Sequence, residues 1–382
     1  MIPYGRQDIS QADIDAVTAV LKSDFLTQGP AVPEFEAALC AATGAAHALA
    51  MNSATSALHV ACAALGLGPG DWLWTSPISF VASANCGLYC GAQVDFVDID
   101  PKSFNMCPEA LARKLEQAER DGTLPKVIVP VHLCGQSCDM ERIGGLARRY
   151  GVKVIEDASH AIGGSYQGLP VGAGTYSDIV VLSFHPVKIV TTAEGGAALT
   201  NDPELAHRMG LLRSHGITRD PARMTHESDG PWYYQQVTLG WNYRMTDLQA
   251  ALGTSQMTKL SAFVDKRHEH ADAYDAALAP LPLTTPWRQP ETRSALHLYV
   301  VQVDAARRRA VFEGLRARGV GVNVHYIPIH LQPHYRAMGF SQGDFPAAEA
   351  YYARAISLPM FPTLSAEDRH YVVTSLAQEL GA

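Results

Sequence analysis

The sequence predicts an α/β protein with a mostly parallel sheet, helices on both faces of it, and a small α+β unit after it. Short apolar runs alternate with amphipathic stretches from about residue 46 onwards. The apolar runs are continuous, as they are in strands that are buried on both faces. With 382 residues, the chain is also too long for one minimal core. Two domains are therefore expected.

The elements of the predicted sheet follow one another in a regular order. We expect strands at residues 46–51, 72–75, 94–97, 127–131, 152–155 and 179–182, and helices at 54–65, 81–89, 108–120 and 140–150. Gly66 directly follows the first helix and is expected to end it. In sheets of this kind, ligands bind at the carboxyl ends of the strands, where the loops carry polar residues.

The second half of the chain predicts a long helix and then a smaller unit. A helical pattern covers residues 246–277, and Pro280, Pro282 and Pro286 then mark a domain boundary. A strand is expected at 296–303, a helix at 305–318, a second strand at 320–326 and a last helix that begins near Ser365. Ser365 and Asp368 resemble a capping box. We therefore divide the chain into a large domain, 1–280, and a small C-terminal domain, 281–382.

Composition and charge exclude several classes of protein. Hydrophobic residues make up 47% of the chain and charged residues 18%, which is typical of a globular protein. The formal net charge of -8 argues against nucleic acid as a partner, because binding to phosphates requires a basic face. No window approaches the roughly 20 apolar residues that span a bilayer. The N-terminal residues 1–6 also lack the features of a signal peptide. We therefore expect a cytoplasmic enzyme.

The cysteines predict neither disulfides nor a metal site. There are seven, an odd number without the spacing of a disulfide framework. His132, Cys134 and Cys138 could suggest a metal site, but a structural zinc requires four ligands, and no second pair of ligands follows. We expect buried cysteines that pack as small apolar side chains, and no metal.

Lys188 and Asp157 are the first candidates for chemistry. Lys188 follows the predicted strand 179–182, and Asp157 follows the strand 152–155. A partly buried lysine beside cationic groups has a lowered pKa and can form a Schiff base. Pyridoxal phosphate requires such a lysine for its aldehyde and an acid for its pyridine nitrogen. Either residue alone would be ordinary, but the pair favours a pyridoxal phosphate enzyme.

Other segments are weaker indications by themselves. Residues 52–57 form a strand-to-helix junction that can bind a phosphate, although Ser53 could simply cap the helix. Phe80 could stack on a planar ring or pack in the core. His160 could reach the ring oxygen or have a structural role. Asn242 and Arg244 precede the long helix, and capping alone does not explain them.

Over nearly its whole length the chain resembles the DegT/StrS family of sugar-nucleotide aminotransferases, which have the fold of type I pyridoxal phosphate enzymes. The similar segments are 26–30, 52–59, 76–83, 156–161, 183–188, 213–216, 241–245, 324–328 and 331–335. Residues 2–7, 22–30, 185–188 and 232–234 are most similar to the pseudaminic acid branch of this family.

The resemblance implies roles for individual residues. Lys188 would form the Schiff base with the cofactor, and Asp157 would pair with its pyridine nitrogen. The other cofactor contacts implied are Phe80 on the ring, His160 near the ring oxygen, and Ala54, Thr55 and Ser183 at the phosphate, with Asn242 reaching the phosphate from a partner subunit. One departure from the family is Ala193, which stands where relatives usually have glycine.

The expected function is transfer of an amino group from L-glutamate to C4 of a UDP-linked 2-acetamido-4-keto-6-deoxy sugar, by a homodimer with shared active sites. Candidate sugar contacts are Tyr4, Arg6, Thr27, Gln28, His185, His325 and Tyr326, and candidate diphosphate contacts are Arg6, Arg213, Arg219 and Arg244. Alternatives are a 4-keto sugar of the perosamine or legionaminic type, and a regulator that binds pyridoxal phosphate without catalysis. A sugar 3-dehydrase has histidine in place of Lys188.

Overall fold

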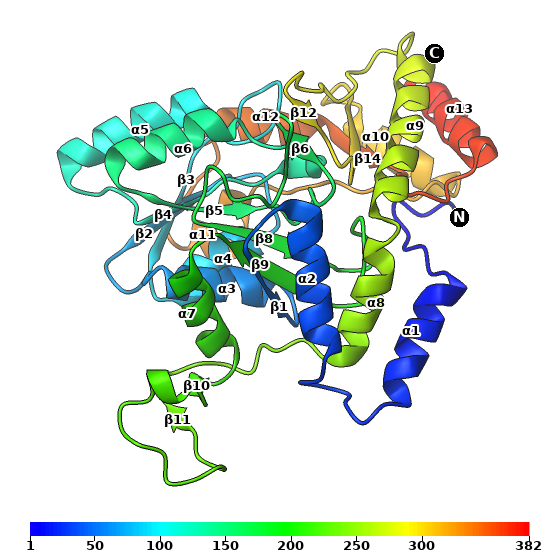
Figure 1. Ribbon diagram of the computed structural model, residues 1–382. Helices are drawn as coiled ribbons and strands as arrows, with labels where there is room; N and C mark the ends of the chain where they lie inside the picture. Colours follow the sequence, from blue (N-terminus) through cyan, green and yellow to red (C-terminus); the bar gives the residue numbers. More distant parts are fainter. Residues whose placement is uncertain (382) are drawn as a thin grey trace.

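The computed structural model describes residues 1–381 and is built around a seven-stranded sheet (Figure 1). Its strands, in spatial order, are β1 (His47–Met51), β9 (Gly196–Thr200), β8 (Ile179–Ser183), β5 (Lys153–Asp157), β4 (Val127–Val129), β2 (Trp72–Thr75) and β3 (Gln93–Phe96). Neighbours from β3 to β8 pair in parallel, whereas β9 runs antiparallel to both β8 and β1. The mostly parallel sheet predicted from the sequence is confirmed.

Both faces of this sheet are covered, which explains the continuous apolar strands. Within β8, Ile179 packs in one apolar cluster with α3 and α4, while the next residue, Val180, packs in another with α2 and α8. Val127 and Ile128 of β4 face opposite sides in the same way. Because successive strand residues point to opposite faces, each of them must be apolar here.

Helices from different parts of the chain form the two covering layers. The helices on one face are α3 (Ala54–Ala64), α4 (Ala82–Tyr89) and α7 (Pro203–Arg213). Those on the other face are α2 (Ala31–Thr43), α5 (Pro108–Asp121), α6 (Met140–Tyr150) and α8 (Asp247–Met257). The N-terminal helix α1 (Gln11–Leu21) packs on α8, where buried Asp13 accepts hydrogen bonds from Ser255, Gln256 and Lys259.

The C-terminal part has an apolar cluster of its own. It is formed by α9 (Leu260–Leu278), β13 (Tyr299–Gln302), α10 (Arg308–Ala317), β14 (Ala355–Leu358) and α13 (Ala366–Leu380). Ile2 packs against this cluster and pairs with Val320, so that the N-terminus joins the C-terminal part. The division at residue 280 stays a prediction.

The remaining elements are short. They are β6 (Ser165–Tyr166), β7 (Leu169–Pro170), β12 (Thr292–Arg293), α11 (Pro333–Arg336), α12 (Pro346–Arg354), β10 (Ile217–Thr218) and β11 (Gln235–Gln236). The chain between β10 and β11 forms an arm that extends away from the sheet beyond α7 (Figure 1). Trp232 and Tyr234 are exposed on this arm.

Two predicted elements were wrong. Residues 320–326 form no strand: isolated bridges join Val320 to Ile2 and Asn323 to Ser357. The side chain of Asn323 accepts a hydrogen bond from the amide of Val324 at 2.8 Å, which competes with a strand ladder.

The predicted helix at 246–277 is two helices, because α8 ends at Met257 and α9 begins at Leu260. Between them, the Thr258 hydroxyl donates a hydrogen bond to the carbonyl of Ser255 at 2.7 Å. Thr246 caps α8 by accepting a hydrogen bond from the amide of Gln249.

Candidate active site

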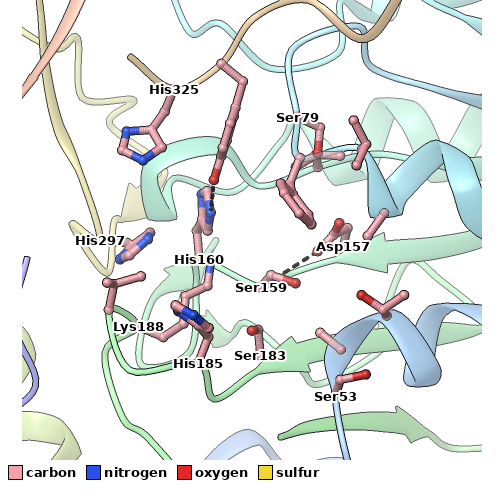
Figure 2. A pocket seen from close by; sticks show the side chains of 18 of the residues that line it. Ser53, Ser79, Asp157, Ser159, His160, Ser183, His185, Lys188, His297 and His325 are labelled. Carbon is pink, nitrogen blue, oxygen red and sulfur yellow. Dashed lines mark hydrogen bonds between the residues drawn. The ribbon is translucent and has the colours of Figure 1, made fainter. Parts of the chain in front are cut away.

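A cavity of about 700 Å³ lies at the carboxyl ends of strands β5 and β8. Its walls come from the N-terminus of α3, the loop before α4, the loop between β8 and β9, and the segment around Tyr326. Figure 2 shows Lys188, His297 and His325 on one side of it, and Asp157, Ser79 and Ser53 on the other. The cavity therefore lies where the sheet topology predicts a ligand.

Lys188 lies on the loop between β8 and β9 and lines this cavity. The loop is closed by hydrogen bonds from the Phe184 amide to the Gly195 carbonyl and from the Thr192 amide to the Phe184 carbonyl. Burial lowers the pKa of the Lys188 amine from 10.5 to about 8, although the carboxylate of Asp157 raises it. A useful fraction of the amine is thus neutral, and nucleophilic, near physiological pH.

Asp157 ends β5 and is 5% exposed. One carboxylate oxygen accepts a hydrogen bond from the Ser83 hydroxyl at 2.6 Å, and the other accepts one from the Ser159 amide at 3.1 Å. Ser83 in turn lies 2.6 Å from Ser79, oxygen to oxygen. Since the Ser83 proton is directed to Asp157, Ser79 donates to Ser83. These contacts fix the orientation of the carboxylate in the cavity.

The N-terminus of α3 forms an anion-binding end of the cavity. Ser53 caps the helix by accepting a hydrogen bond from the Ser56 amide at 3.1 Å, as the simpler interpretation held. Within residues 1–381, however, the structure gives no hydrogen-bond partner to the amides of Ala54 and Thr55 or to the Ser183 hydroxyl. Free amides at a helix N-terminus bind phosphate. Capping and anion binding therefore coexist here.

Gly196 completes this end of the cavity, and sequence analysis missed it. A Cβ at this position would lie 2.3 Å from the backbone nitrogen of Ala54. Because glycine has no side chain, the start of β9 can pass directly against the N-terminus of α3. The run Glu194-Gly195-Gly196 was a signal for this close approach.

Ala193, the departure from the family pattern, keeps the turn that glycine would form. Its φ is 65°, in the left-handed region. Its amide donates to the Thr191 hydroxyl at 3.0 Å, and the Thr192 hydroxyl donates to the Glu194 carbonyl at 2.7 Å. The loop that carries Lys188 is therefore formed with alanine, at some cost in backbone strain.

His160 and Tyr326 meet in the cavity. The Nε2 atom of His160 lies 3.1 Å from the Tyr326 hydroxyl, and its Nδ1 atom lies 3.3 Å from the amide of Cys134. Burial and the charge of Lys188 hold the pKa of His160 well below its usual range. Sequence analysis placed His160 and Tyr326 at the site separately and missed their contact.

Further predicted contacts lie around the cavity. Phe80 is 58% exposed and presents its ring to it, as a residue that stacks on a ligand would. Tyr4, His185 and His325 also line the cavity. Burial and Lys188 lower the pKa of His325 to about 4. His297 and Asn323 line it too and were not predicted.

Other predicted site residues lie outside the cavity of the described chain. Arg6, Thr27, Gln28 and Asn242 are exposed and do not line it. The loop of Thr27 and Gln28 is held by Asp247, whose carboxylate accepts a hydrogen bond from the Gly29 amide at 3.2 Å.

The four candidate arginines lie outside the cavity as well, and Arg213 has a structural partner. It forms an ion pair with Glu36 and donates to the Ala50 carbonyl at 2.7 Å. Arg244 lies 3.4 Å from the Ser214 hydroxyl, and Arg219 lies over the ring of Tyr234. Among the described residues that line the cavity, Lys188 is the only lysine or arginine.

The described residues provide neither a metal site nor a membrane-spanning helix. Across residues 1–381, no group of three or more His, Cys, Asp or Glu side chains is placed to hold a metal ion. Over the same residues, no helix is long and apolar enough to cross a membrane.

The side chains of His132 and Cys138 have protein partners or are buried. The Nε2 atom of His132 lies 2.7 Å from a carboxylate oxygen of Glu156, and its Nδ1 atom accepts a hydrogen bond from the Cys138 amide. Cys138 itself is buried.

The residues around the cavity fit pyridoxal phosphate. The cofactor requires an amine for its aldehyde, an acid for its pyridine nitrogen and donors for its phosphate. Lys188, Asp157 and the free amides of Ala54 and Thr55 supply these three requirements within one cavity. Ser183 and Phe80 add a hydroxyl for the phosphate and an aromatic face for the ring.

Residues 7–377 match the DegT/DnrJ/EryC1/StrS aminotransferase family. Among characterised sequences, the chain is 39% identical to the spore coat polysaccharide biosynthesis protein SpsC of Bacillus subtilis. It is 37% identical to the UDP-4-amino-4,6-dideoxy-N-acetyl-beta-L-altrosamine transaminase of Campylobacter jejuni. Each match covers 98% of this chain and 96% of the relative.

Solved structures agree with these matches. Helicobacter pylori PseC, an aminotransferase involved in the biosynthesis of pseudoaminic acid, superimposes with a TM-score of 0.91 at 33% identity, over 100% of this chain and 99% of PseC. The putative sugar aminotransferase Spr1654 of Streptococcus pneumoniae, in its PLP-form, gives a TM-score of 0.90 at 29% identity, over 100% of this chain and 98% of Spr1654.

Family, fold and cavity therefore agree. The match covers nearly the whole chain, and the fold is that of pyridoxal phosphate aminotransferases. Pyridoxal phosphate is the cofactor, and Lys188, Asp157 and the N-terminus of α3, which fit it, line one cavity. The chain is an aminotransferase and belongs to the DegT/DnrJ/EryC1/StrS family.

Proposed function

We propose that the enzyme transfers an amino group from L-glutamate to C4 of a UDP-linked 2-acetamido-4-keto-6-deoxy sugar, in the synthesis of a pseudaminic acid precursor. The observation that carries the proposal is the cavity that joins the Lys188 amine, the Asp157 carboxylate and the free amides of α3. The printed activities of the Campylobacter and Helicobacter relatives support the choice of sugar.

The chemistry of the cavity wall also fits a sugar. The cavity is lined by Tyr4, Asn323, His325 and Tyr326. Burial raises the pKa of the two tyrosine hydroxyls, which therefore stay protonated near pH 7. It lowers the pKa of His325, whose ring is therefore neutral at this pH. Neutral donors and acceptors suit the hydroxyl and acetamido groups of a sugar ring. A site whose buried polar side chains pair with such groups discriminates strongly against a sugar that leaves one of those side chains without a partner.

Lys188 would act as the general base. With a pKa of about 8, about one amine in ten is neutral at pH 7 and can accept a proton. Lys188 would take the proton from Cα of the donor and, in the reverse direction, would return a proton to C4 of the ketosugar. When bound, pyridoxal phosphate supplies the electron sink that stabilises a carbanion next to the transferred nitrogen.

Asp157 would keep the pyridine nitrogen protonated. Its carboxylate is oriented by Ser83 and Ser159, so that it can accept a hydrogen bond from the ring N–H without reorganising. The amides of Ala54 and Thr55 would hold the phosphate at the other end of the cofactor. The ring would thereby be held between two anchors in the cavity that Lys188 also lines.

A second copy of the chain would complete the site. A UDP diphosphate requires cations, yet the described lining residues include no arginine. Asn242 is exposed and outside its own cavity, and Arg219 is exposed on the arm between β10 and β11. A two-fold dimer would bring such residues to the neighbouring cavity. The homodimer and the cytoplasmic location remain predictions.

The proposal is tested with a panel of UDP-, GDP- and dTDP-linked 4-keto-6-deoxy sugars, each incubated with glutamate and analysed by mass spectrometry. We expect the UDP-linked 2-acetamido sugar of the β-L-arabino configuration to have the highest catalytic efficiency. Its C5 epimer is the matched competitor. A preference for the epimer, or for a GDP- or dTDP-linked sugar, would contradict the proposed substrate and leave the aminotransferase assignment intact.

A further inference from the structure

The two nitrogens of His160 have different partners, and this determines where the ring proton lies. The Cys134 amide can only donate, so Nδ1, 3.3 Å away, accepts and carries no proton. Burial and the charge of Lys188 lower the pKa of His160 well below its usual range, so that the ring carries one proton near pH 7. That proton is on Nε2, which donates to the Tyr326 oxygen at 3.1 Å.

This hydrogen bond leaves the hydroxyl proton of Tyr326 free. The Tyr326 oxygen accepts from His160, and the described residues offer its proton no acceptor. Burial raises the pKa of the Tyr326 phenol, and the hydroxyl therefore stays protonated. Tyr326 lines the cavity together with Lys188. Its proton is thus available to a bound molecule.

The packing holds this pair in place. The rings of His160 and Tyr326 are inclined by 25°, and the ring of His297 also packs against His160, with 4.4 Å between the ring centroids. Burial and neighbouring charges also lower the pKa of His297 well below its usual range. The His160–Tyr326 pair therefore has a fixed hydrogen-bond direction near neutral pH.

We propose that His160, as the Nε2–H tautomer, is a positioning residue that directs the Tyr326 hydroxyl to donate a hydrogen bond to the ketone oxygen of the sugar. This inference rests on the proposed function, because it needs a ketone in the cavity. Negative charge develops on that oxygen when the amine adds to C4, and a fixed donor stabilises it. No proton is transferred in this contact.

Glutamine provides a conservative test of His160. A glutamine side chain can accept from the Cys134 amide with its oxygen and donate to Tyr326 with its nitrogen, whereas leucine can do neither. In single-turnover experiments, His160→Leu and Tyr326→Phe should each slow amination of the ketosugar about 100-fold, while His160→Gln should restore most of the rate. The glutamate half-reaction contains no ketosugar, so in each variant it should slow much less than the amination of the ketosugar does.

The double variant His160→Leu/Tyr326→Phe should be no slower than Tyr326→Phe alone, because His160 acts through Tyr326. Additive losses, or equal losses in both half-reactions, would overturn the inference. The second result would point to a contact with the cofactor or to a structural role. If wild-type protein fails to aminate the ketosugar at all, the proposed function fails first, and the two failures are thus distinguishable.

A measurement on the cofactor-free protein tests the tautomer without activity. In ¹⁵N-histidine NMR spectra, the resonances that His160→Gln removes should show a protonated Nε2 and an unprotonated Nδ1 at pH 7. A proton on Nδ1, or on both nitrogens, would overturn the assigned direction of the hydrogen bond.

Discussion

Replacing Lys188 by methionine should stabilise the cofactor-free protein at neutral pH and not at high pH. Burial lowers the pKa of this amine from 10.5 to about 8. Each pKa unit corresponds to about 1.36 kcal/mol, so that the charged amine costs the folded state about 3 kcal/mol. Because Lys188 keeps some accessible surface at the cavity, we expect about 2 kcal/mol.

The pH dependence has a definite sign. Below pH 8 the amine is charged in both the folded and the unfolded state, and the folded state bears the full cost. Between pH 8 and pH 10.5 the unfolded chain binds more protons than the folded one, so the stability of wild type rises with pH. Above pH 10.5 the amine is neutral in both states, and the cost has disappeared.

The assay is urea denaturation of cofactor-free wild type and Lys188→Met, at one protein concentration, from pH 7 to pH 11. The matched control is Lys22→Met, which removes a positive charge from an exposed position. The excess stability of Lys188→Met, after correction by this control, should fall by about 2 kcal/mol between pH 8 and pH 10.5. An excess that stays constant over this range would refute the argument that burial makes Lys188 nucleophilic.

Three further predictions address single features of the site. Asp157→Asn should retain the fold and some cofactor but lose activity by a factor of about 100 or more in steady-state assays, and full activity would exclude its pairing with the pyridine nitrogen. Ala193→Gly should raise the free energy of unfolding by about 0.5–1 kcal/mol, since φ at this position is 65°; unchanged stability in urea would show that the turn is unstrained. Mixing inactive Lys188→Ala with inactive Asn242→Ala subunits should restore part of the activity in heterodimers, whereas no recovery would mean that each subunit builds its own site.

Most of the sheet could be predicted because its strands are buried on both faces. Trp72–Thr75 and Ile179–Ser183 are continuous apolar runs that end in polar loops, and their short length and their aromatic or β-branched residues favour strands. Strand β9 begins Gly196-Ala197-Ala198, and small residues of this kind carry no strand signal. Only its pairing with β8 and β1 makes it a strand.

The site could be predicted where chemistry and position coincide in the sequence. Asp157 ends one strand and Lys188 follows the next strand of the sheet, so their meeting at one sheet edge follows from the topology. Ser83 lies 74 residues from Asp157 along the chain, and nothing in the sequence shows that α4 brings it to the carboxylate. The same holds for the Tyr326 hydroxyl and His160, which come from segments 166 residues apart.

Arginine positions were the hardest to predict. Arg213 lies in one of the segments that resemble the family, and we expected it to bind the diphosphate of the substrate. In the structure it forms an ion pair with Glu36 and donates to the Ala50 carbonyl. A half-buried ion pair of this kind depends on a partner from α2, which local sequence does not reveal. Contacts that a second subunit supplies, such as that expected of Asn242, are likewise invisible in one chain.

The central claim is that Lys188 enables amino transfer from glutamate to C4 of the UDP-linked ketosugar. The direct measurement uses ¹⁵N-labelled glutamate, the ketosugar and the holoenzyme, with product analysis by mass spectrometry and NMR. The account predicts one ¹⁵N atom bonded to C4 in the wild-type product and none with Lys188→Arg, which keeps the charge but cannot form the Schiff base. A product without the label, or label transfer by Lys188→Arg at the wild-type rate, would contradict it.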